Sequence, residues 1–145
     1  MAVSTIFWRP FAWLAIDANY TASHARYDNG DYIPNAFENA GQIGVSVVLN
    51  RWEASLRLRH LGPYPLIEDN SQRDSGSNVI NLRGAFKPGK FELFGEVLNV
   101  LNSRDKDISY YYESLVPGFD AAPTEGRLSR VVEPRTVRVG AKYHF

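Results

Sequence analysis

The stretch that decides the fold is PRTVRVGAKYHF, residues 134–145 of the chain. Its apolar side chains fall on every second residue, and polar or small residues occupy the positions between them. The apolar positions are Val137, Val139, Ala141, Tyr143 and Phe145. A strict period of two is typical of a β-strand with one apolar and one polar face. The sequence therefore predicts a strand that ends on an aromatic residue, at a place where most chains fray into solvent.

The same alternation recurs in earlier segments of the chain. Long strands are expected near residues 12–26, 41–50, 52–62, 78–87, 90–101 and 134–145, and a shorter one around residues 2–8. Helical spacing of apolar residues is not sustained anywhere. The sequence therefore predicts an all-β protein, folded as an antiparallel up-and-down meander of six or seven long strands.

The connections between these strands alternate between short and long. Short turns are expected at Arg9-Pro10, at Asn50-Arg51 and at Lys87–Lys90. Long polar loops are expected over residues 27–40, 62–77 and 102–133. Every second connection of a meander lies at the same end, so one end carries tight turns and the other carries large loops. This asymmetry, with strands long enough to cross a bilayer at a tilt, is typical of outer-membrane β-barrels.

The distribution of aromatic residues and of small residues on the apolar faces also indicates an outer-membrane barrel. Aromatic side chains gather near the short turns and again near the long loops, which predicts two aromatic girdles at membrane surfaces. Small residues such as Gly84 and Gly95 interrupt the apolar positions, which suits lipid better than a densely packed core. The alternative is a soluble sheet with ordinary aromatic residues at its edges.

Composition excludes several classes of function. Lys+Arg 16 balances Asp+Glu 16, so there is no net positive charge to attract nucleic acid. The absence of cysteine excludes disulfides, thiolate metal sites and cysteine nucleophiles. No apolar run approaches the roughly 20 residues of a membrane helix. Residues 1–16 have the pattern of a strand and not that of a secretory signal.

Four motifs together resemble the C-terminal end of a TonB-dependent outer-membrane receptor. They are residues 134–145, EVLNVLNSRDKDISYYYES at 96–114, YIPNAFENA at 32–40 and LRHLGPYPLIEDNS at 58–71. The resemblance covers essentially all 145 residues. It implies that residues 1–145 form the C-terminal part of a 22-stranded transmembrane β-barrel in the Gram-negative outer membrane. The earlier strands and the plug domain of such a receptor are not visible in this sequence.

The resemblance also implies partners and residue roles. Receptors of this family take up ferric siderophores, cobalamin, oligosaccharides or other scarce solutes, and they act with a plug domain and TonB. In outer-membrane proteins the barrel-assembly machinery recognises the terminal strand, which implies that role for Tyr143 and Phe145. Charged residues on the polar strand faces are expected to line the lumen, where they pair with each other, contact the plug or meet the solute. They are Asp17, Glu53, Arg57, Arg59, Arg83, Glu92, Glu96, Arg138 and Lys142, with His144 beside them.

No catalytic, cofactor or metal site is expected. His24, His60 and His144 are widely separated and lack the spacing of metal ligands. Glu92 and Glu96 lie about 13 Å apart along one strand face, farther than the carboxylate pairs that hydrolyse glycosides. The segment with Asp105 and Asp107 lacks the other ligands of a calcium loop and is interpreted as a solvated loop. The sequence therefore predicts a protein that is not an enzyme.

Two alternatives to a receptor segment stay open. One is a complete outer-membrane barrel of about eight strands with a structural or adhesive role. The other is a soluble ligand-binding barrel of the lipocalin type. The second needs apolar residues on the inner face, whereas the polar faces here carry the charges.

Overall fold

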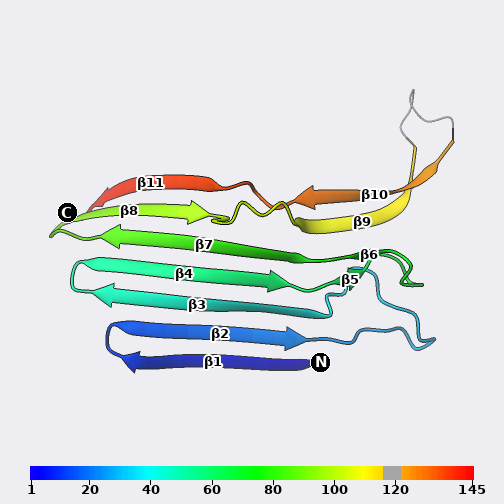
Figure 1. Cartoon of the computed structure of the whole chain (residues 1–145), viewed down its shortest axis with the longest axis horizontal. Helices are drawn as coiled ribbons and strands as arrows, with labels where there is room; N and C mark the ends of the chain where they lie inside the picture. The colour runs from blue at the N-terminus through cyan, green and yellow to red at the C-terminus, as the bar shows by residue number, and fades with distance from the viewer. Residues whose placement is uncertain (116–121) are drawn as a thin grey trace.

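The protein folds as one long antiparallel sheet with two short hairpins at one end (Figure 1). The computed structural model describes residues 1–115 and 122–145. The sheet has seven strands in the order β1-β2-β3-β4-β7-β8-β11. Their bounds are β1 (Ala2–Phe11), β2 (Leu14–Ala22), β3 (Asn39–Leu49), β4 (Trp52–Leu61), β7 (Ser77–Phe86), β8 (Phe91–Leu98) and β11 (Thr136–Tyr143). The predicted all-β antiparallel meander is therefore confirmed.

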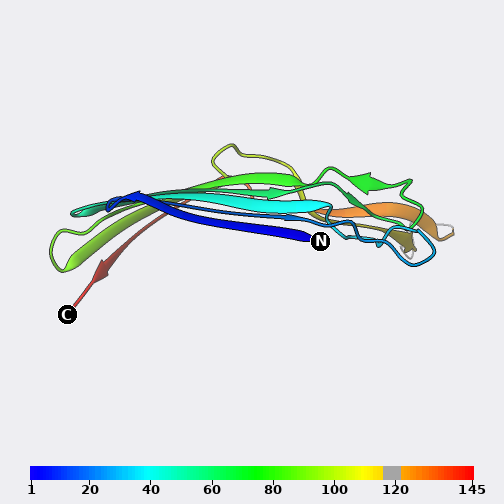
Figure 2. The ribbon, with the colours of Figure 1, turned by 90° about the horizontal axis from the view of Figure 1, so that it is seen from below.

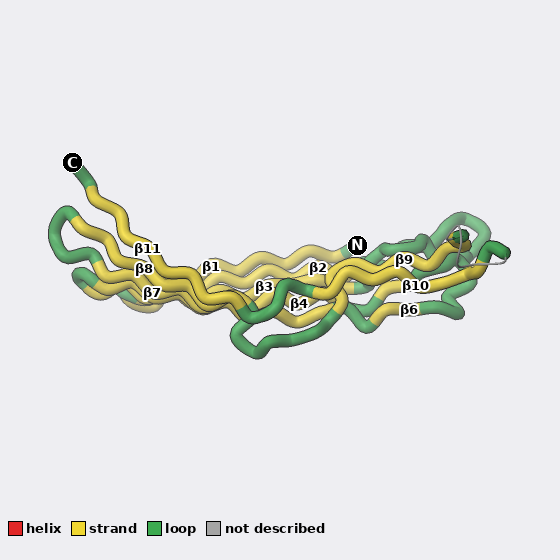
Figure 3. Tube along the Cα trace, turned by 90° about the horizontal axis from the view of Figure 1, so that it is seen from above, coloured by secondary structure: helices red, strands yellow, loops and turns green. Residues whose placement is uncertain are grey.

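The sheet is a single curved layer, as the two views turned by 90° show (Figures 2 and 3). Most of its large apolar side chains are exposed, and the few buried apolar residues lie mainly in or beside the long connections. Within the part of the chain that the structure describes, no helix is long and apolar enough to span a membrane.

One register aligns residues of like character across the whole sheet. A single row of paired residues is apolar in all seven strands. It runs through Trp8, Ile16, Val45, Leu56, Leu82, Val97 and Val137. The next row is polar or small through its length, with Ala15, Ser46, Ser55, Arg83, Glu96 and Arg138. Because strand side chains alternate between faces, this register gives the sheet one apolar and one polar face.

The short turns at the other end of the sheet agree with the prediction at two of three places. Asn50 turns β3 into β4 with φ 46, and Gly89 turns β7 into β8 with φ 68. Both residue types adopt this left-handed conformation more readily than others. The turn predicted at Arg9-Pro10 is wrong, because both residues belong to β1 and the chain turns at residues 12–13. Pro10 is tolerated there because the register of β1 shifts between Trp8 and Phe11, and such an irregularity does not need the missing N–H.

The long connections contain two hairpins that were predicted as loop. The connection over residues 62–77 forms β5 (Tyr64–Pro65) and β6 (Arg73–Asp74). The connection over 102–133 forms β9 (Lys106–Ser114) and β10 (Thr124–Val131), and its residues 116–121 lie outside the described residues. In Figure 1, β9 and β10 continue in line with β8 and β11. The loop prediction was wrong here because polar residues in these hairpins are buried against each other.

A hydrogen-bonded network joins the two hairpins. The Ser109 hydroxyl contacts the Asp74 carboxylate at 2.5 Å and the Ser129 hydroxyl at 2.8 Å. The Ser109 backbone N–H donates to the Tyr64 hydroxyl at 3.0 Å. Tyr64, Asp74 and Ser109 are all buried, and burial raises the pKa of the Tyr64 phenol. The β5–β6 and β9–β10 hairpins therefore pack against each other and bury side chains, whereas most large apolar side chains of the sheet are exposed.

Candidate functional site: the polar face and its arginine pocket

All nine charged residues predicted to face a lumen lie on the polar face of the sheet. They are Asp17, Glu53, Arg57, Arg59, Arg83, Glu92, Glu96, Arg138 and Lys142. His144 follows β11, and its backbone N–H donates to the Lys90 carbonyl at 2.9 Å. That this face lines a lumen stays a prediction. Most of these residues belong to two clusters, and Asp17 forms an ion pair with Arg57 across the sheet.

The cluster nearest the short turns surrounds the carboxylate of Glu92. The Arg83 guanidinium lies 2.5 Å from Glu96 and 3.5 Å from Glu92. The Lys142 Nζ and the His144 Nε2 lie 4.0 Å and 3.9 Å from Glu92, which is only 8% exposed. These contacts connect β7, β8 and β11 across three neighbouring strands.

An aromatic ring lies beneath these cations. The Arg83 and Lys142 charges lie 5.1 Å and 5.4 Å from the centre of the Phe94 ring, within the range of cation–π attraction. Gly140 is paired with Phe94, and a Cβ on Gly140 would lie 2.5 Å from that ring. The missing side chain of Gly140 therefore makes room for the ring. Near this cluster, the Lys87 Nζ lies 2.5 Å from the Glu53 carboxylate.

The ion pair between Asp17 and Arg57 spans a strand that carries no side chain at the crossing point. Asp17 on β2 is paired with Gly44 on β3, which is paired with Arg57 on β4. The Arg57 guanidinium lies 3.3 Å from the Asp17 carboxylate. A Cβ on Gly44 would lie 2.5 Å from a carboxylate oxygen of Asp17. Gly44 therefore allows two strands that are not neighbours to form an ion pair.

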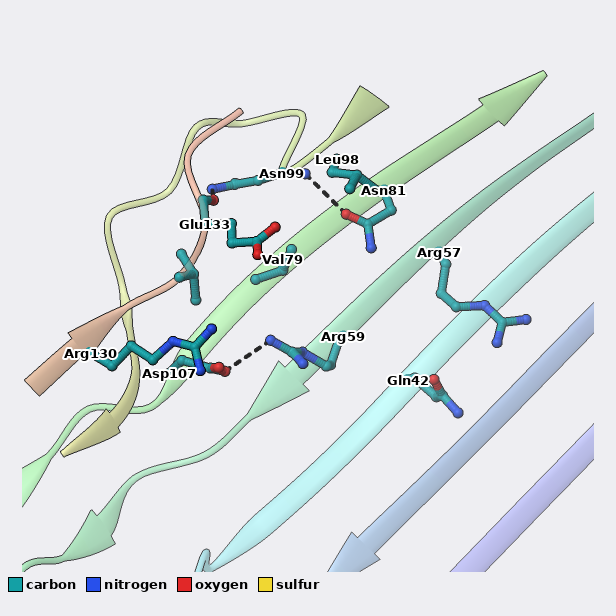
Figure 4. A pocket seen from close by; sticks show the side chains of 11 residues that line it. Gln42, Arg57, Arg59, Val79, Asn81, Leu98, Asn99, Asp107, Arg130 and Glu133 are labelled. Carbon is teal, nitrogen blue, oxygen red and sulfur yellow. Dashed lines mark hydrogen bonds and ion pairs between the residues drawn. The ribbon is translucent and has the colours of Figure 1, made fainter. Parts of the chain in front are cut away.

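The second cluster lines a pocket of about 300 Å³ near the long connections (Figure 4). Strands β3, β4 and β7 form its floor, and the end of β8 and the β9–β10 hairpin form its wall. Its polar lining includes Gln42, Arg57, Arg59, Asn81, Asp107 and Arg130. The Arg59 guanidinium donates to the Asp107 carboxylate at 3.0 Å. In Figure 4, Asp107 lies between the guanidinium groups of Arg59 and Arg130.

Asn99 holds the pocket wall in place. Its backbone has φ 50, and its side chain is buried with 2% of the residue exposed. The side-chain amide donates to the carbonyls of Ser103 and Glu133 at 2.9 Å and 2.8 Å, and its oxygen accepts from the Ser103 N–H at 2.9 Å. The Asn99 N–H donates to the Asn81 side chain at 3.0 Å. Asn99 thus fixes both segments that connect the sheet to the β9–β10 hairpin.

The sequence matches no protein-family model and no curated protein. Among solved structures it is similar to the crystal structure of the ferric yersiniabactin uptake receptor FyuA from Yersinia pestis. The TM-score is 0.74 at 17% sequence identity, and the match covers 99% of this chain and 23% of that chain. The fold is that of a segment of a TonB-dependent receptor barrel. The chain spans less than a quarter of the length of the receptor that it matches.

Three charged residues that line the pocket were not predicted as site residues from the sequence. They are Asp107, Arg130 and Glu133. Asp107 was interpreted as part of a solvated loop, and Arg130 and Glu133 were left in the same loop. The signal that could have indicated the strands of Asp107 and Arg130 is the β-prone tyrosine run at residues 110–112, which pairs with residues 126–128. Among the described residues, no three His, Asp or Glu side chains are placed to hold a metal ion.

Proposed function

We propose that the chain is the C-terminal part of the barrel wall of a TonB-dependent receptor in the Gram-negative outer membrane. The receptor takes up a scarce solute such as a ferric siderophore, cobalamin or an oligosaccharide. The observation that carries this proposal is the register, which keeps one apolar and one polar face through all seven strands. The likeness in fold to a solved uptake receptor supports it.

The apolar face would contact the lipid. Its side chains include Val139, which is 81% exposed, and Val137 and Trp52, which are 66% and 61% exposed. Soluble monomers rarely expose a continuous apolar surface of this kind. At the short-turn end, Trp52 stacks on Phe86 at 4.3 Å, and Phe91 contacts Tyr143 at 4.9 Å between ring centres. Aromatic pairs at the ends of strands suit the membrane–water boundary.

The polar face would line the lumen, where the full-length receptor would hold its plug domain and bind TonB and the solute. On this face, acidic and basic side chains form ion pairs with each other, which suits a surface in contact with water or with the plug. Tyr143 and Phe145 would form the signal for the barrel-assembly machinery. Their rings meet edge to face at 5.2 Å, and the Phe145 side chain is fully exposed.

Single cysteines test the assignment of the two faces, because the chain has none of its own. Ser55→Cys and Leu56→Cys are matched neighbours on β4, one on each face. In isolated outer membranes opened to water on both sides, a water-soluble maleimide is expected to label Ser55→Cys and to leave Leu56→Cys unlabelled until the protein is denatured. Rapid labelling of Leu56→Cys in intact membranes, or recovery of the protein outside the outer-membrane fraction, would contradict the proposal.

A further inference from the structure

We propose that the pocket between Arg59 and Arg130 binds an anionic small solute through its carboxylate or phosphate groups. The Asp107 carboxylate, which accepts a hydrogen bond from Arg59, marks the position of that anion. This inference rests on the proposed function and adds the chemical class of the solute. It is carried by Arg59, which contacts the Asp107 carboxylate, and by Arg130, which lines the opposite wall of the same pocket without an ion pair in the described part of the chain.

The pocket has more cationic than anionic groups. Arg57, Arg59 and Arg130 line it together with only two carboxylates, those of Asp107 and Glu133. A guanidinium has five N–H donors in a planar fork that matches carboxylate and phosphate oxygens. Arg59 uses a single nitrogen for Asp107. No hydrogen bond or ion pair of the Arg130 side chain is found within the described part of the chain.

Two of the arginines, Arg59 and Arg130, lie on opposite walls of the pocket, and the third is turned away from it. Arg57 and Arg59 lie two residues apart on β4 and so share a face. Arg130 comes from β10 in the opposite wall, and Figure 4 shows the Arg59 and Arg130 guanidinium groups on two sides of Asp107. Arg57 lies at the rim and leans across β3 toward Asp17. An anion that displaced Asp107 would therefore contact Arg59 and lie between it and Arg130, while Arg57 stays paired with Asp17 at the rim.

Access and hydrogen-bonding groups also suit an anion. The side chains of Arg57 and Arg59 are 51% and 48% exposed, so a solute can approach them. The amides of Gln42 and Asn81 lie on the same floor and supply further donors. A carboxylate or phosphate group can accept charge-assisted hydrogen bonds from both Arg59 and Arg130, which a neutral sugar cannot match.

The test uses two anionic probes, citrate and inorganic phosphate, and one neutral probe, maltotriose. Binding to the full-length protein that the gene encodes is measured by titration calorimetry in detergent at low ionic strength. Arg130→Gln removes a guanidinium that has no contact to lose, and it is expected to weaken binding of the anionic probe at least tenfold. Asp107→Asn is expected to strengthen it several-fold, because it frees Arg59 and removes a competing charge.

Two control variants separate the pocket from the rest of the surface. Arg138→Gln removes an arginine of the same polar face outside the pocket, and Glu113→Gln removes a carboxylate of the same hairpin outside the pocket. Both are expected to leave binding within twofold. Each variant is checked for heat-dependent migration in gels, which reports a folded barrel. A preference for citrate over phosphate, or the reverse, identifies the group that the solute carries.

The inference is overturned if Arg130→Gln binds both anions as the unmodified protein does, if Asp107→Asn weakens binding, or if Arg138→Gln has the same effect as Arg130→Gln. Tight binding of maltotriose with no binding of either anion also overturns it. Its failure is distinct from failure of the proposed function. A protein that labels on the expected face in the outer membrane but binds no anion refutes only the inference, and anion binding by a protein outside that membrane refutes only the proposed function.

Discussion

The Asp74 carboxylate accepts a hydrogen bond of 2.5 Å from the Ser109 hydroxyl, which lies 35 residues away in the chain. This contact joins the β5–β6 hairpin to the β9–β10 hairpin. The Asp74 side chain also accepts from the Gly76 N–H at 3.2 Å and lies 3.8 Å from the Lys106 Nζ. Asp74 is 2% exposed and Ser109 is fully buried, so water cannot take the place of the carboxylate as the acceptor for the Ser109 hydroxyl.

Removal of this carboxylate is expected to loosen both hairpins together. Asp74→Ala leaves buried donors without an acceptor, at a cost of about 1–3 kcal/mol. Hydrogen exchange is expected to accelerate at the amides of residues 64–76 and 106–114 and to stay unchanged in β2 and β3. Glu68→Ala, which removes an exposed carboxylate from the same connection, is the control. Faster exchange in only one hairpin would show that Asp74 does not couple them.

Gly140→Ala is expected to destabilise the β8–β11 pair. The added Cβ would lie 2.5 Å from the Phe94 ring and would displace it from beneath Arg83 and Lys142. Overpacking of this kind costs about 1–3 kcal/mol, measured as a fall in the free energy of unfolding by urea in phospholipid vesicles. Gly95→Ala is the matched control on the same strand pair, where the nearest atom would be 3.9 Å away. Equal losses for the two variants would contradict the packing explanation.

Substitutions of Asn99 are expected to separate its backbone role from its side-chain role. Asn99→Gly keeps the left-handed backbone and loses three hydrogen bonds of the side chain. Asn99→Ala loses the same bonds and adds strain at φ 50, so it should be less stable than Asn99→Gly by about 1 kcal/mol. Unfolding by urea measures both. An alanine variant as stable as the glycine variant would show that the backbone conformation is not strained.

A charge on the apolar face is expected to be far more damaging than one on the polar face. Under the proposed function, Val139→Lys places an ammonium group in lipid, at a cost of about 2–4 kcal/mol near the middle of the membrane. Thr136→Lys on the polar face of the same strand should cost less than about 0.5 kcal/mol. Refolding yield into vesicles measures the difference. Similar yields for both variants would place Val139 outside the lipid.

The sheet could be predicted from the sequence because alternate residues of each strand face polar and apolar surroundings, so the pattern is visible within each strand. Each strand such as β4 or β11 carries its own alternation, and Asn50 and Gly89 mark turns by local conformation alone. The hairpins could not be predicted in this way. Their polar residues are buried by partners far along the chain, as Ser109 is by Tyr64, and no local pattern records such contacts. Proline misled the prediction at residue 10, where a register shift within β1 accommodates the missing N–H.

The candidate site divides along the same line. The arginines of β4 follow from alternation, so Arg57 and Arg59 were predicted on the polar face. Asp107 and Arg130 join them only because Asn99 and the segment before β11 place the β9–β10 hairpin in line with β8 and β11, beside the ends of β4 and β7. The pocket is thus a product of tertiary folding, and its floor alone is visible in the sequence.

The continuation of β8 and β11 by β9 and β10 has a consequence for the rate at which the last strand finds its partner. The end of β8 at Leu98 and the start of β11 at Thr136 are separated by a long stretch of chain, and closing such a loop costs entropy before any sheet contact forms. Once β9 has paired with β10, only two short bridges remain between the paired strands. We therefore expect the β9–β10 hairpin to form first and to hold the start of β11 near the end of β8. Pairing of β11 with β8 would then proceed residue by residue from that end.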